Sequence, residues 1–297
     1  MYRLRLARQR GFGLFVFVLA ASAIALSLVL GYSGMMTREE ANRRPVKQRT
    51  AMEQHRQQIL AFYRTVAGEY DRASAGNTYT VADVLKGASI NQRWGLQAEM
   101  SNLLPAEGNL RYRRFVLYYP SETDEANPPS IEAFRQTGVF QSCANPDLDC
   151  AKREFMVFDT LSIHREAAQE TQRRLERIAL KAQAYFKARM MQDPEKNISV
   201  NYFRPMFGKC DKRLSMDLQC VDTFAPLVVR NGFGWAPTNN LAQTLGLTDE
   251  ELLSAWGDPI EVSNKEGSEV SEPPFTMVFR VPSPFGGYYT VRAIQQI

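Results

Sequence analysis

Histidine is scarce in this sequence: only His55 and His164 occur among 297 residues. The chain also lacks a Gly-x-Ser-x-Gly elbow, a glycine-rich phosphate loop and a His-Glu-x-x-His motif. Catalysis needs titratable groups that converge on one place, and these patterns are the common ways of supplying them. We therefore expect no enzyme, no catalytic residue and no cofactor.

A strongly basic surface is missing as well. The formal net charge is +4, and four of the basic residues are the clustered Arg3, Arg5, Arg8 and Arg10. The remainder of the chain is close to neutral, and no basic stripe interleaved with aromatic residues follows. This balance excludes the usual electrostatic footprint of a nucleic-acid-binding protein.

Cysteine is limited to four residues in two local pairs, Cys143/Cys150 and Cys210/Cys220. In an oxidising compartment such short-range pairs are typical of disulfides. Three pairings are possible, and we expect the one that joins each local pair. The spacings of seven and ten residues do not match the short spacings of structural zinc sites, so we expect no metal.

Charge is absent from Gly11 to Thr37. A helix that crosses a bilayer needs about 20 apolar residues, so this stretch predicts a transmembrane helix at 12–36. The arginines before it place the N-terminus in the cytoplasm and everything after Ser33 outside. A cleaved secretory signal peptide is the alternative, but this apolar run is longer than its usual apolar region.

The junction RQRG followed by FGLFVFVLAA resembles the N-terminus of type IV prepilins and type II secretion pseudopilins. The resemblance implies that a prepilin peptidase cuts after Gly11 and that Phe12 becomes the N-methylated mature terminus. It also implies that the apolar helix packs against the same helix of other subunits. The expected assembly residues are Phe12, Leu14, Phe15, Val16, Ala21 and Ala25.

Two positions in this helix bear on its packing. Ala21 and Ala25 stand four residues apart, the small-xxx-small spacing that lets helices approach closely. Val16 stands where the family normally has a glutamate that pairs with a neighbouring subunit's amino terminus. Family members without that glutamate are typically minor or initiating subunits, which implies a position at the tip of a filament.

Later periodicities predict alternating helices and strands. A break at Arg44–Pro45 is followed by an amphipathic helix that begins at the capping box Thr50–Glu53 and buries Ile59, Tyr63 and Val66. The charge run on a second helix at 163–192 is expected to be a solvated face. Strands are expected at 111–119, 153–161, 198–203, 224–229, 277–281 and 288–293, and a short helix at 248–255.

The sequence Trp256-Gly257-Asp258-Pro259 and the strands after it resemble the turn and closing antiparallel strands of pilin-type globular domains. The expected fold is α+β, with an N-terminal transmembrane helix, an amphipathic helix on an antiparallel sheet and two pilin-like helix-plus-sheet lobes. The expected parts are a basic leader (1–11), the assembly helix (12–36) and two periplasmic regions (37–162 and 163–297).

Two functions fit these patterns. The first is a minor or tip subunit of a type IV pilus-like or pseudopilus filament, located in the bacterial inner membrane, the periplasm or an extracellular filament. Its partners would be other pilin-like subunits, the prepilin peptidase and the inner membrane. The second is an uncleaved inner-membrane adaptor of a secretion or envelope machine with a periplasmic binding domain. Cleavage after Gly11 separates them.

Overall fold

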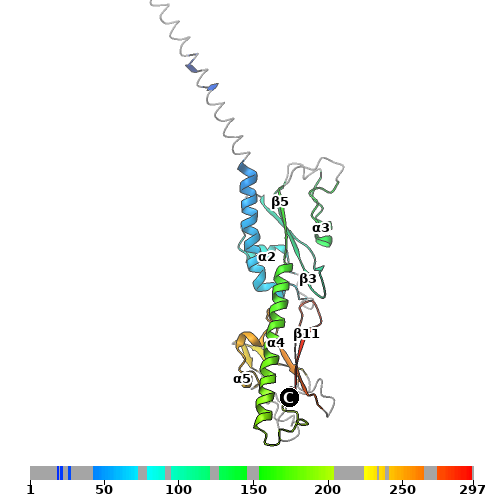
Figure 1. Ribbon diagram of the computed structural model, residues 1–297. Coiled ribbons are helices and arrows are strands. Elements are labelled where there is room, and N and C mark those ends of the chain that lie inside the picture. Colours follow the sequence, from blue (N-terminus) through cyan, green and yellow to red (C-terminus); the bar gives the residue numbers. More distant parts are fainter. Residues whose placement is uncertain are drawn as a thin grey trace, which may run out of the picture.

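The computed structural model contains two helix-and-sheet lobes stacked end to end, with the C-terminus in the second lobe (Figure 1). In the first lobe a helix at residues 43–70 lies beside strand β5, and in the second lobe the long helix α4 lies beside strand β11. Besides residues 19, 21, 22, 26 and 27, the structure describes residues 43–72, 79–90, 95–120, 127–145, 154–203, 224–232, 234–237, 241–263 and 273–295.

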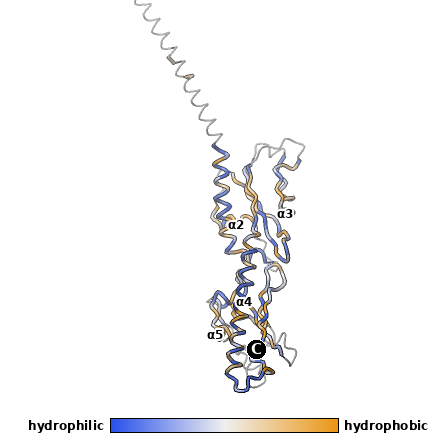
Figure 2. Tube along the Cα trace, viewed as in Figure 1, coloured by the Kyte–Doolittle hydropathy of each residue, from blue (hydrophilic) through white to orange (hydrophobic). Residues whose placement is uncertain are grey.

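The expected α+β class with antiparallel sheets is confirmed, but the transmembrane helix in that expectation was wrong. In the part of the chain that the structure describes, no helix has both the length and the apolar character needed to cross a bilayer. The two long described helices carry charged residues along their whole length, and Figure 2 shows hydrophilic and hydrophobic residues alternating along α4. Only five residues of 12–36 are among those described.

The helix at 43–70 continues through Arg44 and Pro45 without interruption, so the expected break at Arg44–Pro45 was wrong. Thr50 does not cap a new helix, because its hydroxyl donates to the Val46 carbonyl oxygen one turn earlier, at 2.9 Å. Apolar residues at helical spacing then form the buried face, which is Met52, Ile59, Tyr63 and Ala67.

The first-lobe sheet has the order β1-β4-β5, and all its pairs are antiparallel. Its β4 is flanked on both sides and buries four successive residues, Phe115 to Tyr118. One face covers the core shared with the 43–70 helix, and the other face packs on Phe134. The elements of this lobe are α2 (Val81–Gly87), β1 (Gln97–Met100), β2 (Leu104–Pro105), β3 (Arg111–Tyr112), β4 (Arg114–Tyr118), α3 (Ile131–Thr137) and β5 (Phe155–Asp159).

Helix α4 (Leu161–Gln192) belongs to both lobes. Its first turn contributes Ile163 to the core of the first lobe, and its later turns contribute Leu175, Ile178 and Phe186 to the core of the second. At 1.5 Å per residue its 32 residues extend over about 48 Å. The two hydrophobic cores are therefore linked by one continuous helix.

The second-lobe sheet has the order β11-β10-β9-β6 and is antiparallel throughout. The expected strand at 198–203 was wrong, because Asn197 and Asn201 accept hydrogen bonds from backbone N–H groups two residues ahead and so form turns. The elements are β6 (Ala225–Pro226), β7 (Val228–Asn231), β8 (Gly234–Pro237), α5 (Leu241–Thr244), the 3₁₀ helix η4 (Asp249–Leu252), β9 (Glu261–Ser263), β10 (Thr276–Pro282) and β11 (Tyr288–Ile294).

Candidate functional site

A group of buried polar side chains is centred on Asp71, just beyond the 43–70 helix, where the first lobe meets the start of α4. Arg113 Nε donates to Asp71 Oδ1 at 2.7 Å, His164 Nε2 donates to Oδ2 at 2.9 Å, and the Tyr63 hydroxyl also donates to Oδ2. We call these four residues the Asp71 cluster. Asp71 is 1% exposed and His164 is fully buried. The cluster ties the 43–70 helix, the β3–β4 connection and the first turn of α4 together.

Electrostatics keep the Asp71 carboxylate ionised. Burial by itself raises the pKa of Asp71, but the hydrogen bond from His164 and the charge of Arg113 lower that pKa by more, so it lies below its usual value. Burial first, and then the charge of Asp71, raise the pKa of Tyr63 well above its usual range. The tyrosine therefore stays protonated and serves as a donor to the carboxylate.

An Asp–His pair can act in acid–base chemistry, but the surroundings of this pair favour a structural role. An ionised carboxylate only accepts hydrogen bonds, so the hydrogen sits on His164 Nε2. The other ring nitrogen, Nδ1, is buried without a partner, and the ring packs edge-on against Phe285 at 4.9 Å between centroids. All the contacts around Asp71 hold elements together, and neither Asp71 nor His164 lines the cavity described below.

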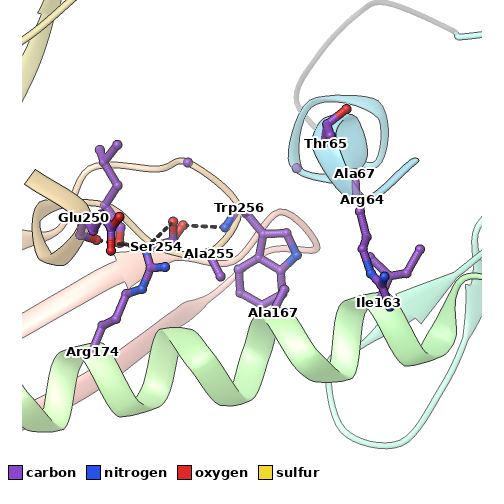
Figure 3. A pocket seen from close by; sticks show the side chains of 13 residues that line it. Arg64, Thr65, Ala67, Ile163, Ala167, Arg174, Glu250, Ser254, Ala255 and Trp256 are labelled. Carbon is purple, nitrogen blue, oxygen red and sulfur yellow. Dashed lines mark hydrogen bonds between the residues drawn. The ribbon is translucent and has the colours of Figure 1, made fainter. Parts of the chain in front are cut away.

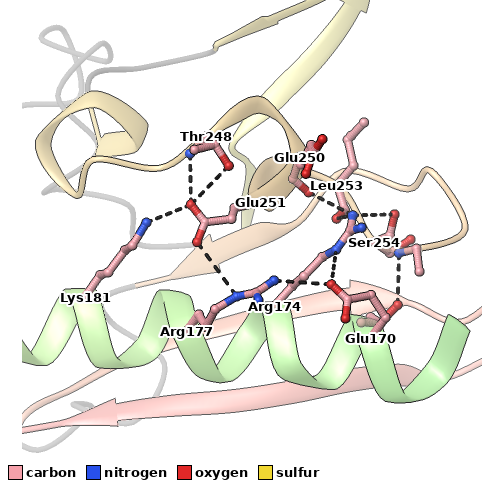
Figure 4. Close-up of polar contacts among 11 residues, drawn as sticks. Glu170, Arg174, Arg177, Lys181, Thr248, Glu250, Glu251, Leu253 and Ser254 are labelled. Atoms are coloured by element: carbon pink, nitrogen blue, oxygen red, sulfur yellow. Dashed lines mark hydrogen bonds and ion pairs between the residues drawn. The ribbon is translucent and has the colours of Figure 1, made fainter. Parts of the chain in front are cut away.

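A second polar group fastens the segment 246–255 to α4 (Figure 4). Arg174 Nη1 donates to the carbonyl oxygens of Glu250 at 2.8 Å and Leu253 at 3.0 Å, while its Nε donates to Glu170 at 3.1 Å. Lys181 Nζ donates to Glu251 at 2.7 Å and to the Gly246 carbonyl oxygen at 2.9 Å. The expectation that this charge run is a solvated face was therefore wrong for Arg174 and Lys181.

The Arg174 contacts give a direct prediction. We expect Arg174→Gln to lower the free energy of unfolding by about 1–3 kcal/mol, because the carbonyl oxygens of Glu250 and Leu253 lose a charged donor. Faster hydrogen exchange over residues 250–257 is the accompanying local readout. Arg173→Gln is the matched control, since Arg173 is the neighbouring arginine and is exposed. Equal effects of the two substitutions would contradict this assignment.

The Trp256 turn lies directly on the first lobe. Its backbone is set by the Ser254 hydroxyl oxygen, which accepts from the Trp256 and Asp258 N–H groups at 3.2 and 3.0 Å, and by Gly257, whose φ is +84°. A Cβ at Gly68 would stand 2.3 Å from the Trp256 carbonyl oxygen, so the helix and the turn touch backbone to backbone.

An ion pair joins the lobes beside this contact. Arg72, which follows the 43–70 helix, donates to the Asp258 carboxylate of the turn. Burial raises the pKa of Asp258, and the Arg72 guanidinium offsets that rise only in part. The second carboxylate oxygen, Oδ2, is buried with no hydrogen-bond partner.

A cavity of about 380 Å³ opens between the two lobes (Figure 3). We call it the interlobe cleft. Three elements form its walls: the 43–70 helix, the first half of α4 and the 250–257 segment. Its lining residues are Arg64, Thr65, Ala67, Gly68, Ile163, Ala167, Arg174, Glu250, Leu253, Ser254, Ala255, Trp256 and Gly257.

Of the residues expected from sequence to direct processing and assembly, only Ala21 is among those the structure describes. Ala21 is described and lies in a helical, exposed position. Gly11, Phe12, Leu14, Phe15, Val16 and Ala25 lie outside the described residues. Of the predicted turn Trp256-Gly257-Asp258-Pro259, Trp256 and Gly257 line the interlobe cleft.

Cys143 is buried and disulfide-bonded. The other three cysteines, Cys150, Cys210 and Cys220, lie outside the described residues, so the pairing stays a prediction. Within the described ranges, no group of three or more histidine, cysteine, aspartate or glutamate side chains is placed to hold a metal ion.

Sequence reasoning missed the Asp71 cluster. Asp71 and His164 are 93 positions apart, and neither belongs to a recognisable motif. One signal was present: Asp71 directly follows the predicted apolar helix, and His164 lies near the start of the next long one.

Comparisons with protein-family models, with curated proteins and with solved structures gave no match.

Proposed function

We propose that this chain is a structural subunit of a filament of the type IV pilus or pseudopilus kind, with the two lobes displayed on the filament. The observation that carries this proposal is the start of the sequence, where four arginines precede Gly11-Phe12 and no charge follows until Arg38. Assembly would proceed by packing of the apolar segment 12–36 against the same segment of neighbouring subunits.

The architecture supports this proposal in one respect. Both lobes lay a long helix along an antiparallel sheet, and the lobes follow one another end to end (Figure 1). The junction is fastened by the His164–Asp71 hydrogen bond at the start of α4, the Arg72–Asp258 ion pair and the backbone contact at Gly68. An elongated body fixed in this way suits a spacer or a tip that extends from a filament.

Val16 bears on the position that the chain would take in the filament. A carboxylate in an apolar assembly is costly and needs a partner, and the valine at this position removes both the cost and the docking charge. A subunit without that charge need not add repeatedly to a growing filament. We therefore place the chain at a minor or tip position.

Processing of the N-terminus tests this function. We expect the full chain, produced with an active prepilin peptidase, to begin at Phe12 in intact-mass measurement and N-terminal sequencing. Gly11→Ala should leave the chain starting at Met1. Gly13→Ala is the matched control, because it alters a glycine two positions later and should leave cleavage after Gly11 unchanged.

Other starting residues would decide against the filament role. A wild-type chain that keeps Met1 beside a peptidase that cuts a known pseudopilin would identify an uncleaved adaptor instead. A chain that begins near Ser33 would identify an exported protein cut by signal peptidase.

A further inference from the structure

The interlobe cleft contains a hydrogen-bond donor with nothing to donate to. Trp256 is 8% exposed, and its indole Nε1 is buried without a partner. Figure 3 shows the indole nitrogen on the side of the ring that faces Arg64 and Ile163 across the cleft. An indole N–H can only donate, so this group requires an acceptor atom. A buried donor left without an acceptor destabilises the folded state.

The positively charged side chain of Arg64 lies on the opposite wall of the interlobe cleft. The Arg64 side chain is 60% exposed, and among the described residues it forms an ion pair at 3.3 Å with Glu166, which is 62% exposed. Such an exposed pair is weak, so the guanidinium can turn to another anion at little cost. The second arginine of the lining, Arg174, is engaged by the carbonyl oxygens of the 250–254 segment.

The size and lining of the cleft indicate more than a site for one water. A volume of about 380 Å³ falls at the lower end of the range of about 300–1,000 Å³ that is typical of small-ligand pockets. Ala67, Ile163, Ala167 and the Trp256 ring provide apolar surface. Glu250 at the other end adds a negative charge, which disfavours an anion with a double charge.

We propose that the interlobe cleft binds a ligand bearing a single carboxylate, with one oxygen accepting from Trp256 Nε1 and the charge paired with Arg64. The apolar part of the ligand lies on Ile163, Ala167 and the indole ring. This site joins two lobes, so a bound carboxylate stabilises their relative position. The cleft can bind such a ligand whether or not the chain assembles into a filament.

The carboxylate can come from a free small molecule or from an acidic side chain of a peptide, and two probes distinguish these sources. Succinate monomethyl ester represents a free monocarboxylate. N-acetyl-L-glutamate methylamide represents an acidic residue within a peptide. N-acetyl-L-glutamine methylamide has nearly the same shape without the charge, and so is the control ligand.

Titration of the full chain with each probe, followed by the indole ¹H–¹⁵N signal of Trp256, tests the site. The signal is assigned by its loss in Trp256→Phe. We expect a saturable shift with at least one carboxylate probe and none with the glutamine derivative. Arg64→Gln should raise the dissociation constant of the carboxylate probe about tenfold or more, because a charge-assisted contact is removed.

Arg56→Gln is the matched control variant, since Arg56 lies two turns earlier on the same helix and pairs with Glu53 away from the cleft. Arg64 is largely exposed, so its substitution leaves the fold intact and the result interpretable. A Trp256 signal that does not move with either carboxylate, or that moves equally with the glutamine derivative, overturns the proposal. An unchanged affinity in Arg64→Gln overturns it as well.

Discussion

Asp71→Asn is expected to lower the free energy of unfolding by about 3–5 kcal/mol, the loss typical of a buried charge whose partner is removed. Arg113, His164 and Tyr63 all donate to the two carboxylate oxygens. An asparagine replaces one acceptor with an N–H₂ group, which meets these donors with another donor. The Arg113 side chain is only 16% exposed, so water cannot replace the lost charge.

Urea unfolding of the two proteins at neutral pH measures this difference. Asp249→Asn is the control, because Asp249 is exposed at the start of η4 and its substitution should change stability by less than about 0.5 kcal/mol. A change of similar size in Asp71→Asn would show that the cluster does not stabilise the fold.

The Asp71 effect should also depend on pH. A carboxyl group whose pKa is lower in the folded chain than in the unfolded chain stabilises the fold above the unfolded pKa. That contribution disappears as the pH falls through the folded pKa. The stability gap between wild type and Asp71→Asn should therefore shrink as the pH falls from about 5 to about 2. A constant gap over that range would mean that the pKa of Asp71 is not lowered.

Gly68→Ala is expected to destabilise the protein by about 1–3 kcal/mol, the usual cost of forcing an extra carbon into a packed site. The sign of this change in stability is informative, because a glycine-to-alanine change inside a helix normally stabilises the protein by about 0.5–1 kcal/mol. Here the new Cβ would lie 2.3 Å from the Trp256 carbonyl oxygen and 2.9 Å from its Cβ. Backbone cannot move aside as a flexible side chain can, so the turn must lift from the helix.

Two measurements check the Gly68 prediction: the free energy of unfolding, and a displaced Trp256 indole signal in the folded variant. Gly232→Ala is the control, because a Cβ there meets nothing within 4 Å. We expect its stability to stay within about 0.5 kcal/mol of the wild type. A more stable Gly68→Ala protein would mean that the Trp256 turn does not rest on the helix.

Elements with strong local patterns were predictable from sequence. The apolar repeat on residues 163–192 became α4, and the aromatic and β-branched runs became β4, β5, β10 and β11. The short helix expected at 248–255 begins with a capping box formed by Thr248 and Glu251, although it is a short 3₁₀ turn. Local periodicity suffices where the residue-by-residue preference agrees with the fold.

The sites at the junction were not predictable in the same way. The Arg72–Asp258 pair spans 186 positions, and the Arg174 contacts span more than 70. A charge run on a helix has the same pattern whether it faces water or the carbonyl oxygens of a distant loop. Only the three-dimensional packing distinguishes Arg174, which holds a turn, from its exposed neighbour Arg173.

The course of α4 through both lobes affects the order in which the chain folds during synthesis. Ile163 and His164 complete the first core and the Asp71 cluster, so the first lobe can close only when the start of α4 has left the ribosome. Once closed, that lobe holds the first turn of α4 in helical form. The rest of the helix can then grow from an existing nucleus, without the unfavourable initiation step, while the strands of the second lobe are still being made.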